Sequence, residues 1–100
     1  MAAIQHIALV QFKPGTSDST ISEIFAQLKS LKGRIPGIID FTSGRNNSPE
    51  GLAGGLTHGF IMTMQNAAAR DSYLVHPEHE KVKVNALPHI ANIVVFDYEF

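Results

Sequence analysis

Five histidines are the residues of this 100-residue sequence with the clearest capacity for chemistry: His6, His58, His76, His79 and His89. Imidazole titrates near neutral pH, so a histidine can act as a general acid, a general base or a metal ligand. The sequence has no cysteine, which excludes disulfides, thiolate metal sites and thiol nucleophiles. A single histidine on a partly apolar strand is more often a structural residue that has found a hydrogen-bond partner.

The segment His76-Pro77-Glu78-His79 has the spacing at which two imidazoles on one helical face can reach one ion. Proline favours the first turn of a helix, which places His76 before the helix rather than on it. No third ligand lies at a recognised offset, so we expect no bound metal. His76 is expected to cap the helix instead, and His79 is free to face a cavity.

Pairing of the first and last predicted strands brings a carboxylate to a histidine. If these strands lie antiparallel with Ile4 opposite residue 99, then His6 lies opposite Asp97. A carboxylate on one imidazole nitrogen fixes the tautomer and raises the basicity of the ring. A salt bridge without function explains the same pair equally well. His58 is harder to bring into this cluster than Tyr73, which follows the far end of its strand.

Hydrophobic periodicity and turn residues predict the elements that position these side chains. Residues 4–12 alternate as a strand, and an apolar stripe predicts a helix that begins near Asp18 and stops at Gly33. The other expected elements are strands over 38–42, 56–64 and 90–98, a short helix over 66–73 and a second helical piece over 77–85. The order β-α-β-β-α-β predicts one α+β domain over residues 1–100 with a ferredoxin-like fold, in which helices cover one face of a four-stranded antiparallel sheet.

The other face of such a sheet has no cover within the chain. We expect this open face to carry the apolar residues Ala8, Val10, Phe60, Met62, Ile93 and Val95. An exposed apolar face of this size usually marks an interaction surface. Two such sheets packed face to face would form a homodimeric α/β barrel with an interior cavity.

Composition and charge exclude several classes of partner. Eight basic and nine acidic side chains are spread without blocks and give a net charge of −1, so we expect neither nucleic acid nor a membrane as a partner. The N-terminus has no basic region before an apolar run, and no run of about 18 apolar residues occurs. The expected location is the cytoplasm.

Several segments together are similar to one known family. They are Tyr73 followed by His76-Pro77-Glu78-His79, the terminal Val95-Phe96-Asp97-Tyr98, the opening 4–13, the turn Ile35-Pro36-Gly37 and the run Gly55-Leu56-Thr57-His58. Over almost its whole length the chain resembles the stress-responsive dimeric A/B barrel family. This resemblance implies a ferredoxin-like protomer in a homodimeric barrel. One plant enzyme of the family closes a linear polyketide by an aldol reaction without a cofactor.

The resemblance also implies roles for individual residues. His79 matches that enzyme's catalytic histidine, Tyr73 matches its catalytic tyrosine, and His6 and His58 match further histidines of its pocket. His79 would take a proton from a carbon next to a carbonyl while Tyr73 holds the enolate oxygen. Leu28 and Ile90 stand where the cyclase has large aromatics, so the substrate does not carry over.

The function expected from the sequence is the binding of a small organic molecule, with no cofactor, in an apolar pocket that contains the catalytic candidates His6, Tyr73 and His79. The expected lining consists of Ala8, Val10, Phe25, Leu28, Phe41, His58, Phe60, Ile90, Ile93, Val95 and Asp97. Two alternatives remain open. One is a structural stress protein without a reaction. The other is a monooxygenase-like barrel, either cofactor-free or haem-associated, in which His58 or His89 would be the nominal haem ligand.

Overall fold

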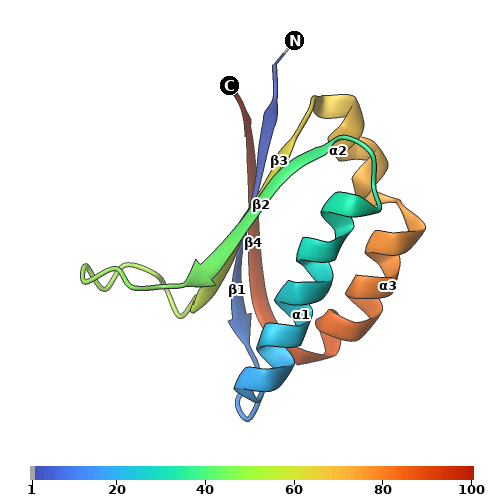
Figure 1. Ribbon diagram of the computed structural model, residues 1–100. Helices are drawn as coiled ribbons and strands as arrows, with labels where there is room; N and C mark the ends of the chain where they lie inside the picture. Colours follow the sequence, from blue (N-terminus) through green and yellow to red (C-terminus); the bar gives the residue numbers. More distant parts are fainter. Residues whose placement is uncertain (1) are drawn as a thin grey trace.

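Residues 2–100, which the computed structural model describes, form four strands and three α-helices (Figure 1). The elements are β1 (Ile4–Phe12), α1 (Asp18–Ser30), β2 (Ile38–Arg45), β3 (His58–Met64), α2 (Ala67–Leu74), α3 (Pro77–Ala86) and β4 (Ile90–Glu99), with 3-10 turns over Leu31–Gly33 and Leu87–His89. The predicted ferredoxin-like arrangement is confirmed. None of the helices in this described part combines the length and the apolarity needed to cross a membrane.

Polar side chains cap the three helices at their N-termini. Ser17 caps α1 and Asn66 caps α2, each by accepting a backbone N–H of the first turn. His76 caps α3: its Nδ1 accepts the backbone N–H of Glu78 at 3.1 Å, and Pro77 occupies the first turn. The expected structural role of His76 is therefore confirmed.

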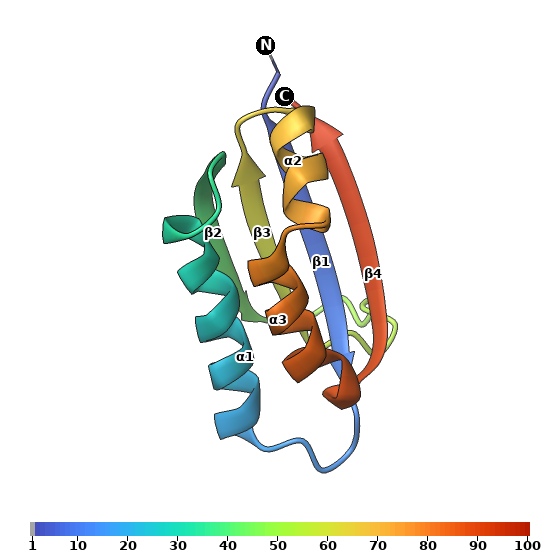
Figure 2. The ribbon, with the colours of Figure 1, turned by 90° about the vertical axis from the view of Figure 1, so that its right-hand side faces the viewer.

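The sheet has the strand order β2-β3-β1-β4 with every pair antiparallel (Figure 2). Ile4 lies opposite Glu99, and His6 lies opposite Asp97, as predicted from antiparallel pairing of the first and last strands. On its other side His6 lies opposite Met62 of β3. Because β1 is a central strand, its helix-facing side chains form the floor of any space between the sheet and the helices.

One expectation about the two faces of the sheet is wrong. Ala8, Val10, Phe60 and Met62 were expected on the open face, but they are buried on the helix-facing side. Ile93 and Val95 share that side because they lie opposite Val10 and Ala8. They remain 43% and 55% exposed since β4 extends beyond the helices at the sheet edge (Figure 2). Both faces of residues 4–12 are apolar, so alternation alone did not reveal which face the helices cover.

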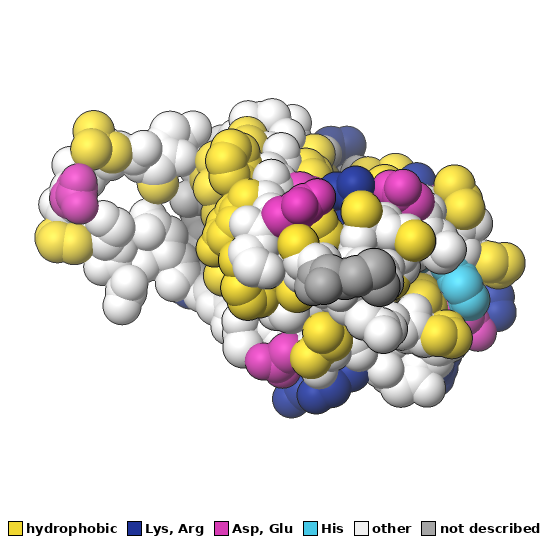
Figure 3. Space-filling view, turned by 90° about the horizontal axis from the view of Figure 1, so that it is seen from above, with side chains coloured by type: hydrophobic (Ala, Val, Ile, Leu, Met, Phe, Trp, Pro, Cys, Tyr) yellow, Lys and Arg dark blue, Asp and Glu magenta, His cyan; other side chains and the backbone are white. Residues whose placement is uncertain are grey.

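The open face carries the side chains that alternate along each strand with the helix-facing ones. Register places Ile7 and Leu9 of β1 beside Ile61 of β3 and beside Phe96 and Val94 of β4. The loop over residues 46–57 projects from the sheet on this side, opposite the helices (Figure 1). Seen from above, hydrophobic side chains gather on the surface that looks toward this loop (Figure 3). The protomer thus leaves an apolar surface uncovered.

Candidate functional site

A cavity of about 220 Å³ lies between the helix-facing side of the sheet and the helices. His6 comes from β1, Tyr73 from the last turn of α2 and His79 from the first turn of α3, and all three line it. Eight of the other predicted lining residues are also there: Ala8, Val10, Phe25, Leu28, Phe60, Ile90, Ile93 and Val95. The wall is therefore mostly apolar, and these three side chains in it can donate or accept a proton.

His6 is held by a carboxylate at the floor of the cavity. It is 5% exposed, and its Nδ1 lies 2.7 Å from Oδ1 of Asp97. An ionised carboxylate only accepts hydrogen bonds, so Nδ1–H is the donor, and in a neutral ring the lone pair is then on Nε2. Asp97 lies behind the imidazole rather than in the cavity lining. This pair can orient a neutral imidazole as a base.

Tyr73 presents a buried hydroxyl without a protein partner. The side chain is 1% exposed, and its oxygen has no hydrogen-bond partner among residues 2–100. Burial raises the pKa of the Tyr73 phenol well above its usual range, because the ionised form loses its hydration. The hydroxyl therefore stays protonated at physiological pH. It is a buried hydrogen-bond donor in a residue that lines the cavity.

His79 stacks on Tyr73, with ring centroids 4.1 Å apart and the planes 24° from parallel. Its Nδ1 lies 3.4 Å from the carbonyl oxygen of Leu74, which favours a proton on that nitrogen. Burial lowers the pKa of His79, and the positive charge of Lys83 acts in the same direction. His6 lies at the edge of the same tyrosine, with ring centroids 5.6 Å apart. Two imidazoles of the site thus pack against one phenol ring.

Three predicted pocket residues do not line this cavity: Asp97, which contacts His6 from outside the lining, Phe41 and His58. Phe41 is buried in the core, where its ring packs against Phe60 at 5.4 Å. His58 lies opposite Val10, toward the other end of β1, and its ring stacks on Phe25 at 5.9 Å. Burial lowers the pKa of His58, and the charge of Arg45 does so further.

Several lining residues on the helices were not predicted from the sequence. Val82, Lys83, Ala86 and Leu87 line the cavity with His79, at the i+3, i+4, i+7 and i+8 positions of one helical face. This spacing was the signal that could have found them. In the part of the chain that the structure describes, no three His, Asp or Glu side chains gather in a way that could hold a metal ion.

The arrangement suits acid–base chemistry on a carbonyl compound. Two imidazoles can accept a proton when neutral, and a protonated phenol that packs against both can stabilise negative charge on an oxygen. An apolar wall strengthens these interactions by excluding water.

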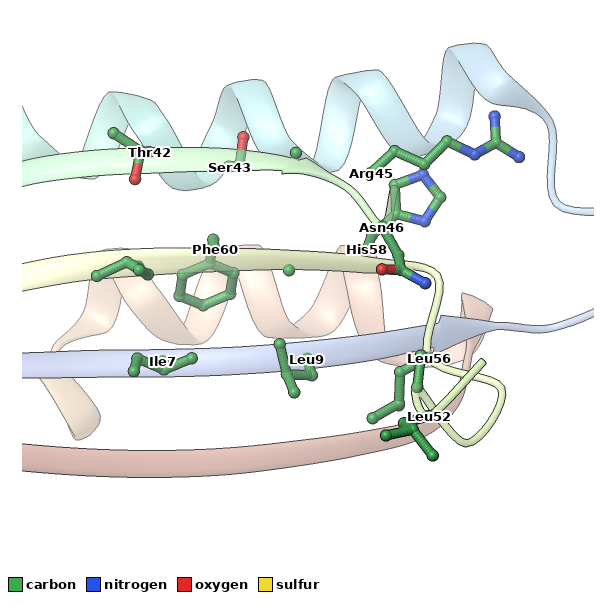
Figure 4. Close-up of a pocket in the computed structure, with 14 residues that line it drawn as sticks. Ile7, Leu9, Thr42, Ser43, Arg45, Asn46, Leu52, Leu56, His58 and Phe60 are labelled. Atoms are coloured by element: carbon green, nitrogen blue, oxygen red, sulfur yellow. The ribbon is translucent and has the colours of Figure 1, made fainter. Parts of the chain in front are cut away.

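A second and wider hollow, of about 520 Å³, lies on the open face of the sheet (Figure 4). Ile7 and Leu9 of β1 form one side, and Leu52 and Leu56 of the projecting loop lie beside them. His58 and Arg45 stand at the end of the hollow where β2 and β3 meet the loop. Its titratable side chains gather at that end, and leucine and isoleucine side chains line much of the rest.

Comparison with known proteins gives concordant matches. The family described as the stress responsive A/B barrel domain matches residues 4–100. A stress-response A/B barrel domain-containing protein of Arabidopsis thaliana is 30% identical over 96% of this chain and 88% of its own length. A dimeric ferredoxin-like protein of unknown function from Jannaschia is 27% identical, with a TM-score of 0.87 over 98% of this chain and 99% of that one. A hydroxynitrile lyase from Passiflora edulis shares the fold, with a TM-score of 0.90, 24% identity and coverage of 98% and 93%.

Proposed function

The chain belongs to the stress responsive A/B barrel domain family, and from this premise and the geometry of the cavity we propose that it binds a small carbonyl compound and moves a proton at the adjacent carbon. The observation that carries the proposal is the buried Tyr73 hydroxyl, which lacks a partner among the described residues and belongs to a ring that packs against both His6 and His79. All the groups this chemistry needs are side chains of the protein, so the proposed reaction uses no cofactor.

Each polar group has one role in the proposed reaction. Nε2 of His79 takes a proton from the carbon next to the carbonyl, and the electrons of the broken C–H bond move onto the carbonyl oxygen. The Tyr73 O–H donates a hydrogen bond to that developing enolate oxygen. His6, oriented by Asp97, is the second imidazole that can return a proton to the product. A neutral His79 is the form that accepts a proton, and burial favours it.

The size of the cavity sets the class of ligand. An engineered apolar cavity of about 150 Å³ binds benzene. The present cavity, of about 220 Å³, suits one aromatic ring with a short substituent. Its apolar wall favours the ring, and Tyr73 favours a carbonyl oxygen on the substituent. Phenylacetone is therefore a suitable probe, and propylbenzene is its counterpart without the oxygen.

Binding of these two probes tests the first half of the proposal. We expect phenylacetone to bind more tightly than propylbenzene, as measured by NMR titration. Tyr73→Phe should remove this difference, which is about fivefold for one net hydrogen bond of about 1 kcal/mol. Tyr98→Phe, at an exposed tyrosine, is the matched control and should leave the difference unchanged. Equal affinities for both probes in the unaltered protein would contradict the role of Tyr73.

Deuterium exchange tests the second half. In D₂O, the protein should speed exchange of the phenylacetone protons next to the carbonyl, and His79→Ala should abolish the increase. His89→Ala is a matched control, since His89 lies in the turn before β4 and does not line the cavity. Binding without faster exchange would reduce the function to binding.

We also propose a homodimer formed through the open face. The supporting observation is the apolar surface of Leu9, Ile61, Val94 and Phe96, of which Phe96 is 63% exposed. A patch of this kind on a small domain usually meets a partner. The hollow beneath the projecting loop adds an apolar recess in which a second copy would pack (Figure 4). The Jannaschia relative is itself described as dimeric.

Sedimentation velocity tests this assembly. Phe96→Asp places a charge in the proposed interface and should convert the dimer to a monomer, because an unpaired buried charge is strongly unfavourable. Val84→Asp is the control, since Val84 is also exposed, at 72%, but lies on α3. A monomeric unaltered protein, or a Phe96→Asp variant that remains dimeric, would contradict the proposed interface.

A further inference from the structure

Arg70 connects the helix that carries Tyr73 to the carboxylate that holds His6. Its Nη1 donates to Oδ2 of Asp97 at 3.0 Å, while Oδ1 of the same carboxylate accepts from His6 at 2.7 Å. Each oxygen of Asp97 therefore has a different partner. Arg70 belongs to α2, Asp97 to β4 and His6 to β1, so the three side chains join three elements.

The contact is sheltered from solvent. The Arg70 side chain is 24% exposed and that of Asp97 is 19% exposed. Fully exposed ion pairs contribute little because water competes with them and both side chains must be ordered. A partly buried carboxylate with one fixed oxygen has fewer orientations, so the hydrogen bond from Arg70 to Oδ2 keeps Oδ1 directed at the imidazole. Asp71 accepts from Nε of Arg70 at 2.8 Å and steadies the guanidinium from the solvent side.

The position of Arg70 along α2 adds a second consequence. Tyr73 lies three residues after Arg70, so both project from neighbouring positions on the helix. The hydrogen bond to Asp97 therefore ties α2 to the sheet next to the place where Tyr73 enters the cavity. Loss of the Arg70–Asp97 hydrogen bond would therefore leave both the position of α2 and the orientation of the Asp97 carboxylate less restricted.

We infer that Arg70 is a positioning residue, which holds Asp97 so that His6 keeps its proton on Nδ1 and its lone pair on Nε2. The groups around His6 are Asp97 from β4, Tyr73 and Arg70 from α2, and His79 from α3. Among these, Asp97 is the acceptor that fixes the tautomer, and Arg70 orients it. The inference rests on the proposed function for its catalytic meaning, but the tautomer itself is a property of the free protein.

The test is the tautomer of His6 in the protein without a ligand. Imidazole nitrogen chemical shifts, recorded by NMR at a pH where His6 is neutral, distinguish the two tautomers. We expect a single form with the proton on Nδ1 in the unaltered protein and a mixture in Arg70→Met. Arg70→Lys, which keeps the charge, should retain most of the single form. Asp97→Asn is the reference for a lost preference, because an amide can donate to the ring as well as accept from it.

Two further variants separate positioning from general stabilisation. Arg34→Met removes an exposed arginine outside the site and should leave the His6 tautomer unchanged. Asp71→Asn should lower the melting temperature slightly, also without changing the tautomer. If Arg70→Met fails to fold, Arg70→Gln is measured in its place and should show the same mixture. A single Nδ1–H tautomer in the folded Arg70→Met or Arg70→Gln variant would overturn the inference, whether or not any carbonyl probe binds.

Discussion

Replacement of Tyr73 by phenylalanine should stabilise the free protein and weaken its hold on a carbonyl compound. The Tyr73 side chain is 1% exposed, and its hydroxyl has no hydrogen-bond partner among the residues described. A buried polar group in this state costs about 1–3 kcal/mol. We use the lower end, about 1 kcal/mol, because the adjoining cavity has room for water. Phenylalanine keeps the ring that stacks on His79, so little packing is lost.

Urea unfolding at neutral pH measures this change in the free energy of unfolding. For a domain of this size, about 1 kcal/mol corresponds to a rise in the melting temperature of about 4–8 °C. Tyr98→Phe is the matched control, because Tyr98 is half exposed and its substitution should change stability by less than about 0.5 kcal/mol. A Tyr73→Phe variant that is less stable by about 1 kcal/mol would refute the reasoning. It would mean that the hydroxyl has a favourable partner in solution.

Three further changes test other parts of the structure. Burial lowers the pKa of His79 in the folded state, so the unfolded chain binds this proton first and stability should fall as the pH drops below about 6.5; His79→Gln should flatten this part of a pH series of urea unfolding curves. Gly37→Ala should cost at least about 1 kcal/mol more of the free energy of unfolding than Gly51→Ala, as measured by chemical denaturation of both variants. Both glycines have positive φ, but an added Cβ at Gly37 would lie 2.6 Å from the Cβ of Ala69, whereas an added Cβ at Gly51 meets nothing within 4 Å. His76→Ala should cost about 1 kcal/mol through loss of the N-cap of α3, seen as a lower unfolding midpoint.

The sequence was sufficient to predict the strand register and the His6–Asp97 pair. The side-chain period of a strand is two, so one correct alignment of β1 with β4 fixes the pairs from Ile4 to Gln11, after which the register shifts. It was not sufficient to predict which face the helices cover, because Ile7 and Leu9 are as apolar as Ala8 and Val10. That choice depends on how the helices dock, which is a tertiary property.

Phe41 and His58 were misplaced for a related reason. Alternation puts a side chain on a face, but it does not say where along that face a cavity opens. His58 shares the helix-facing side with His6, yet the rings of Phe12 and Phe25 pack around it at the other end of β1. Arg70 was missed because its contact with β4 depends on the docking of α2.

The interruption between α2 and α3 makes the pairing of Tyr73 with His79 possible. In one continuous helix, two residues six positions apart would point about 120° away from each other, since each residue advances about 100°. Such a helix could not stack the two rings. The chain leaves the helix at Val75, and His76 and Pro77 start a new one, so the last turn of α2 and the first turn of α3 each direct one ring toward the other. The ring centroids then lie 4.1 Å apart. Pro77 and its cap are therefore determinants of the site even though neither lines the cavity.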